Sequence, residues 1–181
     1  LPWQKAIIKS DYQYRRKARI GVQYNKHGEA IVGFRLSQSN HLIDIQHCPV
    51  LVSEISDICI ELKKRLDTLT AHKSVGHIEV ISANKVCIVV RQLITMPEAD
   101  KAIWKTAEKH NNWQVLIDNG DNISKLSDLS ENSIENSTEH DLFYQLADRT
   151  QINFSANDFI QVNHQVNQLM VEQAITWLGL S

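Results

Sequence analysis

The sequence predicts an α+β fold, a mostly antiparallel sheet with two or three packed helices. Short runs with apolar side chains at every second position recur along the chain, and this is the period of a β-strand. Two longer segments, 50–70 and 97–110, carry apolar residues at helical spacing. Because several strands follow one another with only a turn between them, an α+β domain is favoured over a doubly wound parallel sheet.

The alternating runs define the predicted strands and their turns. In chain order the strands are 14–25, 29–36, 42–45, 76–83, 85–91, 113–117, 143–147 and 150–154. Gly28 ends the polar turn between the first two strands, and Asn84 suits the tight turn between the fourth and the fifth. We therefore expect antiparallel hairpins at both places, and a third hairpin around Asp148 and Arg149.

Three segments have the pattern of amphipathic helices. The apolar stripe of segment 50–70 consists of Leu51, Ile55, Ile58, Leu62, Leu66 and Leu69. Pro97 opens the second helix in its first turn, where a missing N–H is tolerated, and Glu98 and Asp100 suit a helix N-terminus. A third stripe predicts a helix over 164–178.

Length and composition limit the classes of protein to which the chain can belong. Its 181 residues suit one sizeable domain or one and a half small ones, and 43% are hydrophobic, which is enough for a core. No apolar run approaches the roughly 18 residues of a membrane span. The first residues lack the layout of a signal peptide, and the chain does not begin with Met, so we expect a piece of a longer protein.

Chemical motifs are scarce in this sequence. Its three cysteines are widely spaced and odd in number, which argues against a disulfide framework and for the reducing cytoplasm. The sequence has no glycine-rich phosphate loop, no pair of metal-binding histidines at helical spacing and no Gly-x-Ser-x-Gly elbow. No classical enzyme class is therefore indicated by a local motif.

Charge is distributed unevenly along the chain. Residues 1–35 carry eight Lys and Arg residues against two Asp and Glu residues. In segment 118–141 the balance reverses, with seven acidic residues against Lys125. We expect the basic segment to face a polyanion, and 118–141 to be a flexible acidic insertion at the surface.

The basic segment contains a candidate RNA-binding strand. In strand geometry Arg15, Lys17 and Arg19 share one face, and Arg16 points to the other. Three cations on one face repel one another unless carboxylates or a polyanion lie opposite. Tyr14 beside them favours nucleic acid, because bases stack on aromatic rings and phosphates pair with Arg. The alternative is an ordinary solvated strand face.

Cys48 is the cysteine whose surroundings suggest a ligand. It precedes Pro49, between a predicted strand and a predicted helix. Cys59 lies beside the helical stripe and Cys87 lies within an apolar strand, so both are predicted to be core residues. An iron–sulfur cluster needs several thiolates, usually four, and Cys48 alone is placed for one. From the residues alone, an inert thiol is therefore favoured at Cys48.

Segment 158–163 lies at a strand-to-helix junction. Phe159, Gln161 and Asn163 share one face if this piece is extended, and the two amides suit the edge of a base or a cofactor. The simpler interpretation makes Phe159 a core residue and Asn163 the N-cap of the following helix. The residue types alone favour the simpler interpretation.

Three segments in the same order resemble the RNA uracil-5-methyltransferases, most closely the bacterial enzymes that act on 23S ribosomal RNA. They are 14–19, 46–49 and 154–163, and two further segments, 33–35 and 166–171, extend the similarity. The Phe-x-Gln-x-Asn sequence within the third segment is the most specific part. The likeness covers nearly the whole chain apart from the acidic insertion.

This resemblance implies a central α+β domain over 1–155 and the start of a Rossmann-like methyltransferase domain over 156–181. It implies an S-adenosylmethionine-dependent enzyme that forms 5-methyluridine in 23S rRNA. The RNA is the only partner it implies, so we expect a cytoplasmic monomer without a membrane or a protein partner. The family's catalytic cysteine, glutamate base and three cluster cysteines have no counterpart in this chain. We therefore assign no catalytic residue and expect the isolated piece to be inactive.

Individual roles follow from the same resemblance. Cys48 resembles the fourth thiolate of a [4Fe–4S] cluster, which reverses the interpretation as an inert thiol. Gln161 resembles a glutamine that contacts S-adenosylmethionine. The residues that resemble substrate-facing or RNA-facing positions are Phe159, Arg15, Arg16 and Arg19. An aromatic beside an amide suits a uracil that has left its stack to expose C5 and C6.

Two other functions are compatible with the sequence. The first is a non-catalytic RNA-binding module that uses the basic strand as its footprint. The second is a related uracil methyltransferase that acts on another rRNA site or on tRNA. Cys48 followed by Pro49 counts against the tRNA type, which lacks the cluster.

Overall fold

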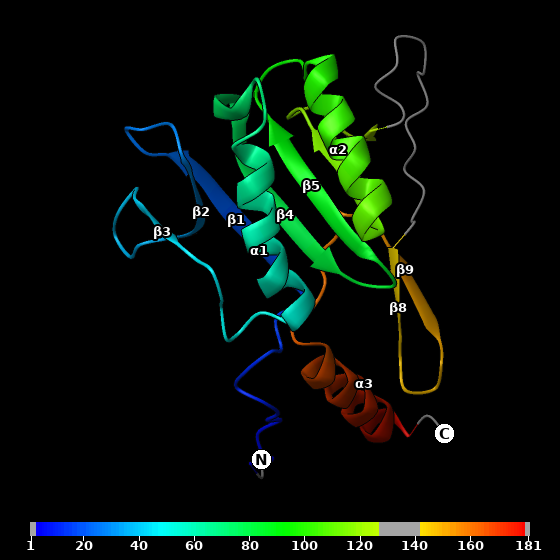
Figure 1. The fold of residues 1–181 in the computed structure, drawn as a ribbon. Helices are drawn as coiled ribbons and strands as arrows, with labels where there is room; N and C mark the ends of the chain where they lie inside the picture. Colours follow the sequence, from blue (N-terminus) through cyan, green and yellow to red (C-terminus); the bar gives the residue numbers. More distant parts are fainter. Residues whose placement is uncertain (1–2, 127–141, 180–181) are drawn as a thin grey trace.

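The computed structural model describes residues 3–126 and 142–179, and its main feature is a seven-stranded sheet (Figure 1). The strands are β1 Lys17–Tyr24, β2 Ala30–Arg35, β3 Leu42–Asp44, β4 Val75–Ser82, β5 Val86–Gln92, β6 Trp113–Asp118 and β7 Ile123–Lys125. Their order across the sheet is β3-β2-β1-β4-β5-β6-β7, and among these described strands only β5 and β6 are parallel neighbours. The predicted α+β class with a mostly antiparallel sheet is confirmed.

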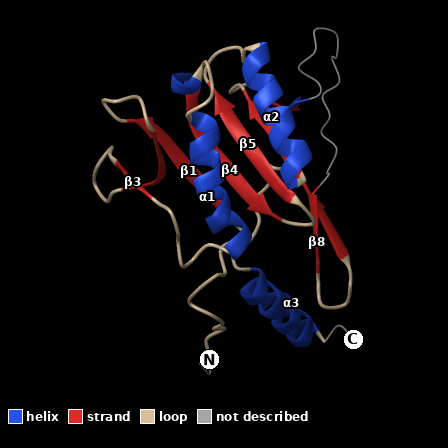
Figure 2. Ribbon diagram, viewed as in Figure 1, coloured by secondary structure: helices blue, strands red, loops and turns tan. Residues whose placement is uncertain are grey.

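Two helices, α1 Ser53–Leu66 and α2 Glu98–Asn111, lie on one face of this sheet (Figures 1 and 2). α2 connects β5 to β6, and such a crossover is what parallel neighbours require. Every residue of the apolar stripe predicted for segment 50–70 is buried in the main core. β1 contributes Ala18, Ile20 and Val22 to the same core, so its alternate residues face the opposite side of the sheet.

α1 begins later and ends earlier than the periodicity predicts. Arg15 and Val52 explain the late start, because the Val52 N–H donates to the Arg15 carbonyl at 3.1 Å and keeps the chain extended there. After α1, the carboxylate of the buried Asp100 accepts hydrogen bonds from the N–H groups of Thr70 and Ala71 at 2.8 and 2.9 Å. A single 3₁₀ turn, η1 His72–Ser74, then leads into β4.

A two-stranded hairpin, β8 Leu142–Gln145 and β9 Gln151–Phe154, forms a second sheet. Its turn lies at 146–150, which confirms the hairpin predicted around Asp148 and Arg149. The N–H of Phe143 donates to Asn84 Oδ1 at 2.9 Å and ties the hairpin to the β4–β5 turn. A second core joins the two sheets; it consists of Ile81, Cys87, Val89, Leu116, Leu142, Phe154, Ala156 and Ile160.

The last helix, α3 His164–Leu178, begins beside the hairpin. Asn163 is its N-cap, and Oδ1 accepts a hydrogen bond from the Val166 N–H at 3.0 Å, so the predicted cap is confirmed. α3 contains no fully buried residue, and Trp177 and Leu178 are exposed near its end. In the part of the chain that the structure describes, no helix has both the length and the apolarity needed to cross a membrane.

Segment 158–163 differs from its sequence-based prediction. It is not a strand, and only Asn163 forms an isolated bridge, with Arg15. Phe159 is 84% exposed, so the interpretation of Phe159 as a core residue is wrong. Its neighbour Ile160 occupies the core instead, with 5% exposed. The start of segment 118–141 completes β6 and forms β7, and residues 127–141 lie outside the described part.

Candidate functional site

A groove of about 560 Å³ brings together residues from distant parts of the sequence. We call it the basic groove. Its lining includes Arg15, Lys17, Arg19, Cys48, Glu79 and Phe159. These residues come from the start of β1 and the segment just before it, from the loop before α1, from β4 and from the segment before α3. Four of the six residues proposed from the sequence as ligands of RNA, cofactor or metal therefore line one surface.

The cations at the start of β1 and just before it lie on two sides of the chain. Lys17 and Arg19 lie on the face opposite α1, while Arg16 shares the buried side with Ala18. The predicted separation of Arg16 from its neighbours is confirmed. Glu79 lies directly across from Arg19 on β4, and Arg19 Nε donates to Glu79 Oε1 at 2.7 Å. Among the described residues of the groove, one carboxylate thus faces three cations, which leaves an excess of positive charge.

Lys17 connects β1 to the segment that carries Phe159. Its ammonium donates hydrogen bonds to the carbonyls of Ala156 at 2.8 Å and Asp158 at 3.0 Å. Ile160 is held in the second core on the other side of Phe159. The ring of Phe159 is therefore exposed at a fixed point of the groove wall. Sequence reasoning placed Lys17 on this face but did not predict these contacts.

Arg16 lies beneath the surface rather than in the groove. It is 5% exposed, and its guanidinium lies 4.2 Å from the centre of the Tyr144 ring. Nε donates to the Gln161 carbonyl at 3.0 Å, and the Arg16 N–H donates to the Val162 carbonyl at 2.9 Å. Burial lowers the pKa of Arg16 from its ordinary value. This geometry gives Arg16 a role in holding the C-terminal segment, and Arg16 does not line the basic groove with the other proposed RNA-facing residues.

Gln161 is presented differently from Phe159. Its backbone carbonyl is held by Arg16, while its side chain is exposed and is not part of the basic groove lining. The backbone of Gln161 is therefore held in place, while its side-chain amide is exposed. Such an arrangement suits a contact with a group that approaches from outside this part of the chain.

Cys48 lines the groove from a loop that α1 holds in place. The Cys48 N–H donates to the hydroxyl of the buried Ser56 at 3.0 Å, and this hydroxyl also contacts His47 Nδ1 at 3.0 Å. Burial first, and the neighbouring Cys48 second, raise the pKa of Cys59 to about 11. Cys59 and Cys87 are buried core residues, as predicted.

The described residues supply one thiolate of a cluster and not a complete metal site. No group of three His, Cys, Asp or Glu side chains suited to a metal ion occurs in the ranges 3–126 and 142–179. Cys48 is half-buried and lines the groove, so its position suits one ligand to a cluster whose other thiolates come from elsewhere.

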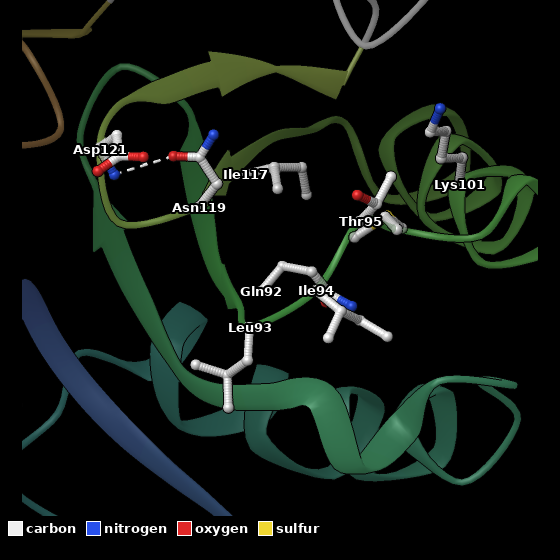
Figure 3. A pocket seen from close by; sticks show the side chains of 9 residues that line it. Gln92, Leu93, Ile94, Thr95, Lys101, Ile117, Asn119 and Asp121 are labelled. Atoms are coloured by element: carbon white, nitrogen blue, oxygen red, sulfur yellow. Dashed lines mark hydrogen bonds between the residues drawn. The ribbon is translucent and has the colours of Figure 1, made fainter.

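A second hollow of about 450 Å³ lies at the carboxyl end of β5 and β6 (Figure 3). Leu93, Ile94, Asn119 and Asp121 line it, and the Asp121 N–H donates to Asn119 Oδ1 at 3.0 Å. The strand registers place it at the opposite end of the sheet from Lys17. It contains none of the residues singled out from the sequence, so we place the candidate site in the basic groove.

Comparison with known proteins gives relatives along almost the whole chain. The chain is 43% identical over 194 aligned residues to the 23S rRNA (uracil(1939)-C(5))-methyltransferase RlmD of Colwellia psychrerythraea, covering 99% of this chain and 40% of that protein. RlmD of Photorhabdus laumondii is 38% identical over 177 residues, covering 96% of this chain and 38% of that protein. The chain thus spans about 40% of the length of these curated relatives. It matches no protein-family model.

The structure is similar to the crystal structure of the Pyrococcus abyssi tRNA (uracil-54, C5)-methyltransferase in complex with S-adenosyl-L-homocysteine. The TM-score is 0.62 at 14% identity, over 92% of this chain and 41% of that chain. In fold and in sequence, the chain is therefore a relative of the RNA uracil-5-methyltransferases. Within this class, the sequence similarity is to the bacterial 23S rRNA enzymes named RlmD, as the residues of the Phe-x-Gln-x-Asn segment predicted.

Proposed function

We propose that the chain is the RNA-facing part of an S-adenosylmethionine-dependent methyltransferase that forms 5-methyluridine in 23S rRNA. The observation that carries the proposal is the basic groove, which unites Arg15, Arg19, Cys48 and Phe159. The relatives named RlmD support the reaction and the RNA class. S-adenosylmethionine supplies the methyl group when it is bound.

The groove would receive RNA through two kinds of contact. Arg15 and Arg19 provide positive charge for phosphates, and such contacts position a nucleic acid without reading its sequence. Phe159 presents a ring that is 84% exposed, and an exposed ring next to cations suits stacking of an unpaired base. A uracil in folded RNA must leave its stack before C5 and C6 can react, so a fixed stacking surface lowers the cost of this step.

Gln161 would contact S-adenosylmethionine beside the extruded uridine. Its support is the anchored backbone and the exposed amide described above. Cys48 would supply one thiolate of a [4Fe–4S] cluster in the longer protein. We assign no nucleophile to this chain, because Cys59 and Cys87 are buried in hydrophobic cores and Cys48 is the proposed cluster ligand.

The same proposal extends to organisation of the longer protein. Residues 1–155 would form a central domain, and 156–181 would begin a methyltransferase domain. The exposed apolar side chains of α3, among them Trp177 and Leu178, support the presence of further chain against that helix. The protein would act as a monomer in the cytoplasm.

Methyl transfer by the full-length protein tests this function. We expect transfer of a labelled methyl group from S-adenosylmethionine to unmodified 23S rRNA, with 5-methyluridine as the product. Transfer to tRNA instead would contradict the rRNA assignment. RNA binding without any methyl transfer would favour the non-catalytic RNA-binding module.

The cluster is tested separately from the reaction. We expect Cys48→Ser to lower the iron and acid-labile sulfide content of the purified full-length protein. Cys87→Ser is the matched control, since Cys87 is buried in the second core. Equal cluster content in the wild-type protein and in Cys48→Ser would remove Cys48 from the ligand set.

A further inference from the structure

A separate cavity of about 470 Å³ lies next to the buried face of Arg16. We call it the Arg16 cavity. It opens between the β4–β5 turn, the first turn of α1, β8 and the first turn of α3. The polar and aromatic residues that line it include Arg16, Glu54, Asn84, Tyr144, Gln145 and His164. Of the basic groove residues named above, none lines this cavity.

The charge of Arg16 is incompletely compensated. Arg16 is only 5% exposed, yet none of the ion pairs in the described residues includes it. Nε and Nη1 contact the Gln161 carbonyl and His164 Nδ1, but Nη2 is buried and has no hydrogen-bond partner among the residues that the structure describes. A buried charge with an unused donor is costly unless an oppositely charged group comes near.

The first turn of α1 adds positive potential at the same place. The N-cap residue Val52 makes no side-chain cap hydrogen bond, and both Val52 and Glu54 line the cavity. The N-terminus of a helix carries a partial positive charge and free N–H groups, which favour anions. Among the described residues that line the cavity, Glu54 is the one with an acidic side chain.

His164 adds a neutral hydrogen-bond donor. Arginine can only donate, so the 3.2 Å contact from Arg16 Nη1 makes His164 Nδ1 an acceptor and leaves the ring proton on Nε2. Burial, and then the charge of Arg16, lower the pKa of His164, so the ring stays neutral at pH 7. The cavity therefore combines a buried guanidinium, an uncapped helix start and a neutral imidazole donor.

We propose that the Arg16 cavity binds a phosphate-type oxyanion. The anion completes the coordination of Arg16 and accepts hydrogen bonds from the first turn of α1 and from His164. Its source is either a backbone phosphate of bound RNA or free phosphate, which present the same oxygen atoms. The site is independent of methyl transfer, so its failure would leave the proposed function untouched.

Inorganic phosphate is the probe, and the full-length protein is the sample. Calorimetric titration at constant ionic strength, with chloride as the balancing anion, should show saturable binding of phosphate. Gln145→Glu places a negative charge at the exposed rim and should weaken binding about tenfold, whereas Glu54→Gln removes one and should tighten it several-fold. Gln38→Glu makes the same charge change in the β2–β3 loop, away from the cavity, and should bind phosphate like the wild-type protein.

Arg16→Gln should abolish phosphate binding, but its buried position also affects folding. The rim variants therefore decide the matter, because Gln145 and Glu54 are exposed and their replacement leaves the core intact. Opposite changes in phosphate affinity in these two variants support the site. The proposed site would be overturned if the wild-type protein did not bind phosphate. It would also be overturned if Gln145→Glu, Glu54→Gln and Gln38→Glu all bound phosphate with equal affinity.

Competition with RNA identifies the source once the rim variants show their opposite effects. If phosphate displaces substrate RNA and Gln145→Glu weakens RNA binding more than Gln38→Glu, the anion is an RNA phosphate. If phosphate binds without affecting RNA, the cavity takes free phosphate. Both results retain the oxyanion site.

Discussion

Arg16 Nε donates a hydrogen bond to the backbone carbonyl of Gln161 at 3.0 Å, across a separation of 145 residues. The backbone N–H of Arg16 donates a hydrogen bond to the Val162 carbonyl at 2.9 Å. Together these bonds fix the segment before α3 against the start of β1. Phe159 and Gln161 thereby keep one position relative to the basic strand.

Replacing Arg16 should loosen this junction. Arg16→Ala removes the donor to the Gln161 carbonyl and one buried side chain, and we expect a loss of about 1–3 kcal/mol in the free energy of unfolding. Arg15→Ala removes a neighbouring cation that is less buried and should cost less. Denaturant unfolding of the full-length proteins measures both. Equal destabilisation by the two substitutions would contradict the role assigned to Arg16.

Arg19 and Glu79 should have opposite effects on RNA binding. Arg19→Gln removes a cation from the basic groove, so RNA affinity should fall and the slope of log affinity against log salt should decrease by about one unit. Glu79→Gln removes the carboxylate that faces Arg19 at 2.7 Å, so affinity should rise. Lys105→Gln, on the exposed surface of α2, is the control. Salt slopes that match the control in both variants would place Arg19 among ordinary surface residues.

Substitutions of the neighbouring residues Phe159 and Ile160 should have different effects, one on RNA methylation and the other on stability. Phe159 is 84% exposed, so Phe159→Ala should leave the unfolding free energy nearly unchanged while methyl transfer to RNA falls. Ile160 is 5% exposed in the second core, and Ile160→Ala should cost about 2–5 kcal/mol of stability. Methyl transfer and denaturant unfolding of each variant distinguish the two roles. Full activity of Phe159→Ala would exclude the stacking role.

His164 should make stability depend on pH in a defined direction. Burial and the charge of Arg16 lower the pKa of His164 in the folded protein, so the unfolded chain binds a proton more readily. Stability should therefore fall as pH decreases below the unfolded value of about 6.5. The His164→Gln variant has no titratable group at this position, so its stability should fall less steeply as pH decreases. Parallel unfolding curves for both proteins between neutral and mildly acidic pH would contradict this assignment.

Local sequence patterns were sufficient for the parts of the site that depend on a single element. The two-residue period predicted for segment 14–25 separated Arg16 from Arg15, Lys17 and Arg19, because side-chain direction alternates along any strand. Asn163 was predictable as a cap because its side chain bonds a residue only three positions later. These features need no knowledge of the rest of the chain.

The other features of the site depend on tertiary contacts, which no local sequence pattern predicts. Residue types alone favoured Phe159 as a core residue, while the family resemblance made it a substrate-facing one; in the structure Ile160 takes the core position and Phe159 is exposed. The hydrogen bonds from Lys17 to the Ala156 and Asp158 carbonyls join residues that are 139 and 141 positions apart in the sequence. The meeting of Cys48 and Phe159 in one groove likewise depends on Arg15, which precedes β1 and forms isolated bridges with both Leu51 and Asn163.

Mapping of RNA crosslinks on the full-length protein tests the central claim, that the basic groove is the RNA-facing surface. Substrate RNA is crosslinked by ultraviolet light, and the modified peptides are identified by mass spectrometry. We expect crosslinks within 14–19 and 156–163, including Phe159, and their loss when unlabelled 23S rRNA competes. Crosslinks confined to the outer surface of α2, with none in these two segments, would contradict the assignment.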